Sequence, residues 1–488
     1  MLLKDLSFRR LFACNLYKNL RLGLAELSLT ADFVHTDRGD PYPLLEKAEG
    51  TSETVAAGAY TVNGRVMRLF AAYFPFAVCE CRLRRLDGRA GFAFVREEGR
   101  VTAAFSTAPD GTLRVTFDDG KTAKTLETGE PFEKDLPLQI ACRAEAFDVY
   151  CGALLRYAGS FSSPVFADGR AEKVFTGAKI AFFADGNVTT SKVSAFLDCG
   201  IAQADVRPVC YENGEVIAEN GKITLTASLR LQAGTYQGVL AWTPGTSDFA
   251  LVGAIFFDAG DGVWQNDVAT SLKFDRRHGR WLLWTCVFSH GHVLAHASFD
   301  GDVRYGVNVV GVTPLPAMRG TDDDTVLCGK PDDEDPDFLF DEKSGKWLLS
   351  VCRMTQRDGQ KRYRYHLFTS DDPFEGYTFL AASATGDETG GSLISFGGAL
   401  QFACGSDYDR RSVYRLYTLP DMAQPSPIRC DLPDGGFRGW GTLIPVRKGA
   451  RTHVYHVTFD RMRASDWNWS YGNLYVFEAI LPPESPKF

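Results

Sequence analysis

Short runs of hydrophobic residues alternate with turn sequences along most of the chain. The runs are rich in Val, Phe, Tyr and Thr, and DG, NG, GG and SG turns separate them. This pattern is typical of β-strands joined by tight turns. Only the first two dozen residues, with apolar positions at Leu6, Leu11 and Leu20, hint at a helix. The sequence therefore predicts an all-β protein.

Between about Leu24 and Ala202 the strands follow one another as in a meander. Two packed antiparallel sheets would account for them. The pairing of LQIACRAEAFDVYCGALLRY with the closing IAFFADGNVTTSKVSAFLDCG resembles the β-sandwiches of concanavalin and laminin-G type. We therefore expect residues 1–202 to comprise an N-terminal extension and a jelly-roll or concanavalin-like β-sandwich. This domain would be ancillary, either shaping one rim of the site or binding carbohydrate.

A strand, a tight turn and a second strand recur five times after Cys199. Examples are SLKFDRRHGRWLLWTC and FLFDEKSGKWLLSVC, and the turn glycines follow one another at intervals of 52 to 66 residues: Gly221, Gly279, Gly345, Gly397 and Gly449. Five such units, each forming a small sheet, predict a five-bladed β-propeller over residues 203–488. The alternative is a second sandwich built from unrelated hairpins.

Carboxyl groups precede most of these hairpins. Asp267, Asp335 and Glu388 lie 12, 10 and 9 residues before their turn glycines, and Asp205 lies 16 before the first. The fifth unit has Trp440 in this region instead. Because the innermost strand of each blade lines a central funnel, we expect these side chains to converge there. The alternative is that they cap strands and solvate loops.

Convergent carboxyl groups beside aromatic side chains fit sugar chemistry. In glycoside hydrolysis one carboxylic acid protonates the leaving oxygen, while a carboxylate activates water or attacks the anomeric carbon. Like charges held close together also raise the pKa of one member, which keeps the acid protonated near neutral pH. The propeller is therefore the predicted catalytic domain.

The propeller half resembles the five-bladed glycoside hydrolases of families 43, 32, 68 and 130. EDPDFLFDEKSGKWLL is similar to the third-blade pattern of family 43, VWQNDVATSLKFDRRHGRWLLW resembles its second-blade region, and DETGGSLISFGGALQF lies where its fourth-blade Glu motif belongs. This resemblance implies Asp205 as general base, Asp335 as the carboxylate that tunes the acid, and Glu388 as general acid, with inversion of configuration. The WQND segment also resembles family 32, which implies Asp267 as nucleophile, with retention.

Other polar and aromatic side chains are candidates for substrate binding. Arg207 and Arg353 match carboxylate or sugar acceptors, although structural ion pairs are equally compatible. His292, in the sequence SHGH, is a candidate hydrogen-bond donor, and Trp264 and Trp440 offer flat apolar faces. The acidic residues of TDDD and DDED favour a solvated loop, and no calcium-binding motif is present, so we expect neither a metal nor a cofactor.

Composition narrows the range of partners. Against 53 Lys and Arg stand 61 Asp and Glu, a net charge of −8 that argues against a nucleic-acid or anionic-membrane surface. No apolar stretch is long enough to span a membrane, and the first residues do not resemble a secretory signal, so we expect a cytoplasmic protein. The 12 cysteines include no CxxC pair and lie mostly in apolar strands, as reduced core thiols do.

These observations together predict a glycoside hydrolase acting on a small oligosaccharide or glycoside, with carbohydrate as its only implied partner. Two alternatives stay open: a carbohydrate-binding protein without turnover, and a phosphorylase on the same scaffold. The sequence leaves open the sugar, the linkage, the anomeric outcome and the oligomeric state.

Overall fold

The computed structural model describes residues 3–30, 33, 40–143, 146–163, 165, 176–232, 234–264, 266–315, 325–326, 333–357, 360–386, 388–406, 414–430, 437–460 and 472–481. Their chain contacts divide the protein into two compact units. One comprises residues 1–20, 199–260 and 264–488, and the other comprises residues 21–198 and 261–263. Within the described residues the helical elements are two 3-10 turns, η1 (Leu3–Asp5) and η2 (Phe288–His290).

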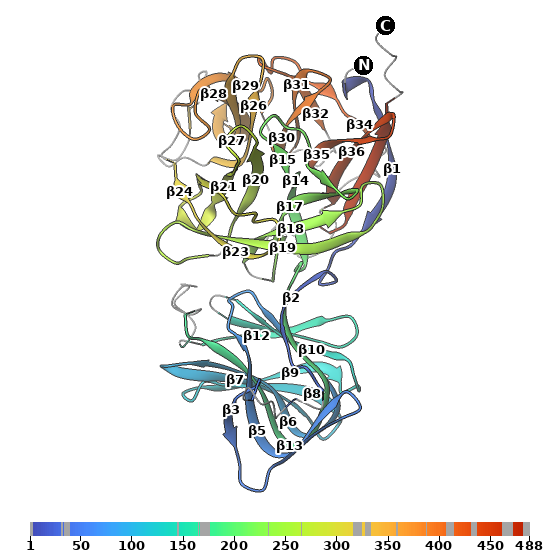
Figure 1. Cartoon of the computed structure of the whole chain (residues 1–488), viewed down its shortest axis with the longest axis vertical. Helices are drawn as coiled ribbons and strands as arrows, with labels where there is room; N and C mark the ends of the chain where they lie inside the picture. The colour runs from blue at the N-terminus through green and yellow to red at the C-terminus, as the bar shows by residue number, and fades with distance from the viewer. Residues whose placement is uncertain are drawn as a thin grey trace. The chain divides into compact units, whose positions relative to one another are not determined.

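The first unit contains five sheets of four to six strands (Figure 1). The first is built from β14 (Ala202–Pro208), β16 (Ala218–Glu219), β17 (Lys222–Arg230), β18 (Thr235–Trp242), β19 (Phe249–Asp258) and β23 (Gly306–Gly311). The second is built from β15 (Cys210–Tyr211), β20 (Asp267–Asp275), β21 (Arg280–Val287), β22 (Val293–Phe299) and β24 (Thr313–Pro314). The third is built from β25 (Thr325–Val326), β26 (Asp333–Asp341), β27 (Lys346–Arg357), β28 (Gln360–Ser370) and β29 (Thr378–Ala382).

The fourth and fifth sheets complete the set. The fourth is built from β30 (Glu388–Phe396), β31 (Ala399–Ser406), β32 (Arg415–Thr418) and β33 (Ser426–Pro427). The fifth is built from β34 (Arg429–Cys430), β35 (Phe437–Lys448), β36 (Arg451–Asp460), β37 (Leu474–Ile480) and the N-terminal strand β1 (Ser7–Cys14). Strand β1 pairs with β37 and therefore closes the last blade with the start of the chain (Figure 1). The sequence hint of a helix in this region was wrong.

The five sheets form a closed ring. Their inner strands contact one another in the order β14, β20, β26, β30 and β35, and β35 contacts β14 again. Apolar clusters lie between consecutive blades, for example Leu282 and Trp284 against Phe338 and Trp347. This arrangement confirms the predicted five-bladed propeller. Each blade buries both faces, because it is covered by a neighbour on either side.

The turn glycine of the first repeat has a different place from the other four. Gly279, Gly345, Gly397 and Gly449 lie in the turns that join the inner strand of a blade to its second strand. Gly221 instead joins the short strand β16 to β17, and the inner strand β14 pairs with β17 through a longer connection. This difference explains why Asp205 lies farther from its turn glycine than the other carboxyl groups do.

The second unit is one hydrogen-bonded network of twelve antiparallel strands. They are β2 (Arg21–Glu26), β3 (Leu44–Lys47), β4 (Ser52–Ala56), β5 (Ala59–Ala72), β6 (Val78–Arg96), β7 (Gly99–Thr107), β8 (Thr112–Asp118), β9 (Ala123–Pro131), β10 (Pro137–Cys142), β11 (Ala146–Cys151), β12 (Arg156–Ser162) and β13 (Lys179–Asp198). Strand β6 pairs with β10 at one end and with β7 at the other, so the long strands run through both halves. The likeness to a concanavalin-type sandwich stays a prediction.

This second unit is organised around one large apolar core. Side chains from both halves of the network join it, including Phe92, Phe105, Ile140 and Phe147. The eleven cysteines in the described part of the chain are free thiols, and most of them are buried. The described residues form no helix that is long and apolar enough to cross a membrane.

Candidate active site

Every inner strand of the propeller carries a β-bulge at a corresponding place. The pairing with the second strand shifts between Ala204 and Arg207, between Val268 and Ser271, between Glu334 and Asp337, between Thr389 and Ser392, and between Arg438 and Gly441. In four blades the first residue of the bulge has a left-handed backbone, with φ of 51° at Asp205, 61° at Ala269, 50° at Asp335 and 62° at Gly390. Bulges redirect side chains and occur often beside active sites.

The bulges establish which carboxyl groups are structurally equivalent. Asp205 and Asp335 occupy the same position in the first and third blades, each at the start of the bulge. Asp267 and Glu388 occupy another position, two residues before the bulge in the second and fourth blades. The sequence placed Asp267, Asp335 and Glu388 in one register, and the structure separates Asp335 from the other two.

Arg207 fastens the bulges to one another. Its Nη1 donates to the carbonyl of Ala269 at 2.9 Å, and its Nη2 donates to the carbonyls of Asp335 at 3.2 Å and Gly391 at 3.1 Å. Burial opposes its charge, but the carboxyl groups of Asp335 and Asp337 outweigh that effect and hold the pKa of Arg207 above its ordinary value. The guanidinium predicted to bind substrate is thus bonded to the backbone of three neighbouring blades.

Asp205 and Asp335 form a buried, electrostatically linked pair. Burial, followed by the charge of Asp335, raises the pKa of Asp205 to about 6. Burial, followed by the charge of Glu334, raises the pKa of Asp335 to about 6 as well. The Oγ of Ser228 donates to Asp205 Oδ2 at 2.6 Å, and Oδ1 of Asp205 has no hydrogen-bond partner among the described residues. Near neutral pH such groups can exchange protons.

Glu388 lies in a cage of hydroxyl groups. Its Oε1 accepts hydrogen bonds from Thr385 Oγ1, at 2.6 Å, and from Tyr417 OH, and its Oε2 accepts one from Ser383 Oγ. The guanidinium of Arg415 is 3.8 Å from Oε1. Burial raises the pKa of Glu388 above its ordinary value, although the three hydroxyl groups act in the opposite direction. A raised pKa is what a general acid requires.

Asp267 is bonded to its own blade. The backbone N–H of Ser289 donates to Asp267 Oδ1 at 3.1 Å, and Ser289 Oγ lies 2.8 and 2.9 Å from the two carboxylate oxygens. The Nε2 of His292 lies 3.0 Å from Glu334 Oε2. The histidine predicted to bind substrate therefore contacts a carboxyl group of the third blade.

Residues of β26 that the sequence analysis did not select also carry buried charges. The carboxylate of Asp333 accepts hydrogen bonds from Arg353 Nε, at 2.8 Å, and from Arg353 Nη2, at 3.0 Å. Arg353, the second arginine predicted to bind substrate, is therefore engaged in a bidentate ion pair. Asp337 lies 3.3 Å from Lys273 Nζ and accepts a 2.6 Å bond from Ser271 Oγ. The described part of the acidic segment thus lies in a buried strand, and the expected solvated loop was wrong there.

A signal for these residues was present in the sequence. Lys273 occurs in the buried strand SLKFD, where an unpaired ammonium group would be unstable, so a carboxylate partner could have been expected. The alternation of Asp333, Asp335 and Asp337 along one strand could likewise have predicted a series of charge partners.

The predicted aromatic platforms have different outcomes. Trp264 is 7% exposed, and its ring centroid lies 6.3 Å from that of Phe256, so this indole is largely enclosed. The backbone of Trp440 lies in β35, but its side chain falls outside the described part of the structure.

A possible metal ligand set among the described residues consists of Glu334, Asp335 and Cys352. Burial, followed by the charges of Glu334 and Asp335, raises the pKa of the Cys352 thiol well above its ordinary value. The thiol also donates to the carbonyl of Glu388 at 3.3 Å. A thiol binds a metal only as the thiolate, so metal binding here would release the proton of Cys352.

No protein-family model and no curated protein matches the chain. Several solved structures do. An α-L-arabinanase from Penicillium chrysogenum in complex with arabinobiose is 10% identical over 77% of this chain and 91% of that one, with a TM-score of 0.35. A thermostable family-43 glycoside hydrolase is 13% identical over 59% and 95%, with a TM-score of 0.38. The carbohydrate-binding module CBM66 from Bacillus subtilis is 12% identical over 32% and 94%, with a TM-score of 0.24. We infer no activity from likenesses this weak.

Proposed function

We propose that this chain is a glycoside hydrolase whose site lies at the bulges of the propeller, with chemistry like that of family 43. The observation that supports this proposal most strongly is the pair Asp205 and Asp335. Both are buried on matching bulges, and both have a pKa raised to about 6. A propeller that needed these residues only for stability would gain little from two mutually repelling carboxyl groups.

Each carboxyl group has a distinct task in this proposal. Glu388, caged by hydroxyl groups, protonates the leaving glycosidic oxygen, and Asp205 takes a proton from the water that attacks the anomeric carbon. Asp335, held by Thr389 Oγ1 and the N–H of Gly390 at 3.2 Å each, orients the acid electrostatically. Glu388 gives its proton to the leaving oxygen and Asp205 takes one from the water. Because that water attacks the anomeric carbon directly, from the face opposite the leaving oxygen, the anomeric configuration inverts.

The direct test is hydrolysis of aryl glycosides and small arabinosides, xylosides and fructosides by the full chain. We expect at least one substrate to turn over, and proton NMR of the first product to show the inverted anomer. Turnover that requires added phosphate would identify a phosphorylase instead. Binding of these sugars without any turnover would replace the proposal by a carbohydrate-binding function.

The pH dependence of kcat/KM gives a second test. Asp205 must be ionised to act as base, so activity should fall below about pH 6, where its carboxylate becomes protonated. Ser228→Ala removes a hydrogen bond that stabilises the charged form. The pKa of Asp205 should then rise, and the acidic limb should move to higher pH by about one unit.

Ser271→Ala is the matched control for this shift. Ser271 also donates a 2.6 Å bond to a buried carboxylate, but that carboxylate is Asp337. The acidic limb of the pH profile of Ser271→Ala should therefore lie at the same pH as that of the wild type. An unmoved limb in Ser228→Ala, or an equal movement in both variants, would show that Asp205 is not the titrating base.

A further inference from the structure

The twelve-stranded unit buries apolar side chains on a second face of its sheet. Along β13, Phe182 belongs to the main core, whereas its neighbours Ala181 and Phe183 belong to a separate cluster with Met67, Ala93 and Ala104. Because successive side chains of a strand point to opposite faces, this cluster lies on the other side of the sheet from the core. A face that usually meets water is here partly enclosed.

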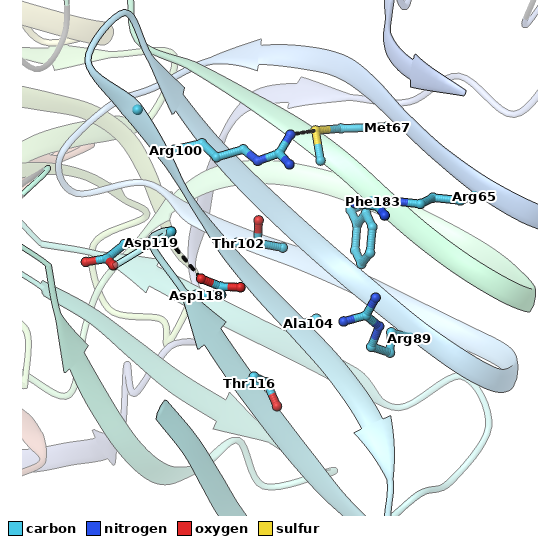
Figure 2. Close-up of a pocket in the computed structure, with 12 residues that line it drawn as sticks. Arg65, Met67, Arg89, Arg100, Thr102, Ala104, Thr116, Asp118, Asp119 and Phe183 are labelled. Carbon is cyan, nitrogen blue, oxygen red and sulfur yellow. Dashed lines mark hydrogen bonds between the residues drawn. The ribbon is translucent and has the colours of Figure 1, made fainter. Parts of the chain in front are cut away.

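Small residues make this face hollow. The strand registers place Met67, Phe183, Gly91, Ala104 and Thr116 in one row across β5, β13, β6, β7 and β8. The large side chains of Met67 and Phe183 lie at one end of this row, and the small residues Gly91 and Ala104 follow them. A cavity of about 360 Å³ results, with Phe183, Met67 and Ala104 among its lining residues (Figure 2).

Polar groups surround the hollow. Arg65, Arg89 and Arg100 line it together with Thr102, Thr116 and Asp118 (Figure 2). The guanidinium carbons of Arg65 and Arg89 lie 5.9 and 5.7 Å from the ring centre of Phe183. Arg100 faces the Met67 thioether at 4.0 Å, a weak acceptor that leaves hydrogen-bonding capacity for a ligand oxygen.

The charges at this site nearly cancel. Arg89 pairs with Asp185 at 2.7 Å, and Glu46 pairs with both Arg65, at 3.6 Å, and Arg100. Asp118 and Asp119 add two more carboxylates, so four carboxylates accompany the three guanidinium groups. A site for phosphate or nucleic acid would carry a clear positive excess. Paired donors and acceptors beside an apolar floor instead match a molecule with many hydroxyl groups and no net charge.

We propose that this hollow binds a neutral saccharide. Arg100, Asp118 and the hydroxyl groups of Thr102 and Thr116 supply hydrogen bonds to sugar hydroxyl groups. Met67, Ala104 and Phe183 supply the apolar surface for the C–H face of a ring. Binding at this site requires no catalysis, so this proposal can be tested separately from the activity proposed for the propeller.

The experiment measures retardation of the full chain in native gels containing arabinan, arabinoxylan or fructan, with polygalacturonate as an acidic probe. The Glu388→Gln background prevents degradation of the probe. We expect a neutral polysaccharide to retard the protein, Arg100→Ala to weaken the apparent affinity about tenfold, and Thr102→Val about fivefold. Far-UV circular dichroism of both variants should match that of the parent.

Arg114→Ala is the matched control. Arg114 lies on β8 of the same sheet, is ion-paired with Glu127 at 2.8 Å and is 40% exposed, against 41% for Arg100, but it does not line the hollow. Its affinity should equal that of the parent. The proposal is overturned if no neutral polysaccharide retards the parent, if Arg100→Ala and Thr102→Val bind as the parent does, or if only polygalacturonate binds.

Discussion

Asp205→Asn is expected to lower kcat/KM by about 10³-fold or more, because the attacking water then has no base. The substitution is nearly isosteric, and the amide can still accept the hydrogen bond from Ser228. It also removes a charge that repels Asp335, so the folded state should lose no stability. The measurement is kcat/KM on the best substrate of the glycoside panel, together with the thermal unfolding midpoint of the variant.

Asp267→Asn separates the two assignments that the sequence left open. Ser289 contacts both carboxylate oxygens of Asp267, and the bulges place Asp267 at the register position of Glu388 rather than at that of Asp205. We expect its kcat/KM to fall less than tenfold. If Asp267→Asn is as damaging as Asp205→Asn and the product retains its configuration, Asp267 is the nucleophile and the base assignment is wrong.

Glu388→Gln adds a test that depends on the leaving group. The variant should lose activity on alkyl glycosides by about 10³-fold. With a dinitrophenyl leaving group, which departs without a proton, it should keep far more activity than Asp205→Asn does. An equal loss on both substrate types would exclude Glu388 as the acid.

Arg207→Ala is expected to destabilise the propeller by about 3–5 kcal/mol. The substitution leaves the carbonyls of Ala269, Asp335 and Gly391 without this donor and removes a positive charge that acts on the buried carboxyl groups of Asp335 and Asp337. Arg207→Lys should fall between the wild type and the alanine variant, because one ammonium group cannot reach all three carbonyls with the geometry of a guanidinium fork.

Tryptophan fluorescence can report this loss for one unit alone. All eight tryptophans lie between residues 242 and 469, and the twelve-stranded unit contains none. The urea midpoint measured in this way should fall in Arg207→Ala. The free energy of unfolding from the same transition should stay within about 1 kcal/mol of wild type in Lys222→Ala, which breaks an exposed ion pair with Asp248 in the first blade. Equal midpoints for both variants would contradict a structural role for Arg207.

The repeat was predictable because blade boundaries depend on local chemistry. Alternating apolar residues and glycine turns at Gly279, Gly345, Gly397 and Gly449 define strand pairs without reference to distant residues. The first repeat differs at Gly221, because this glycine joins β16 to β17, whereas β14 pairs with β17 through a longer connection. The short hairpin of β16 and β17 has the same kind of glycine turn as the inner hairpins of the other blades, so the turn alone does not identify the inner strand.

The sequence by itself determined an all-β chain, five propeller repeats and the presence of acidic residues on inner strands, since strand alternation and turn formation act over a few residues. Tertiary structure decided which groups meet. The bulges that align Asp205 with Asp335, the three carbonyls around Arg207 and the hydrogen bond from Tyr417 to Glu388 all join residues from different strands. The closing of the fifth blade by β1 likewise unites the two ends of the chain. Such contacts depend on long-range packing and burial, which no local pattern encodes.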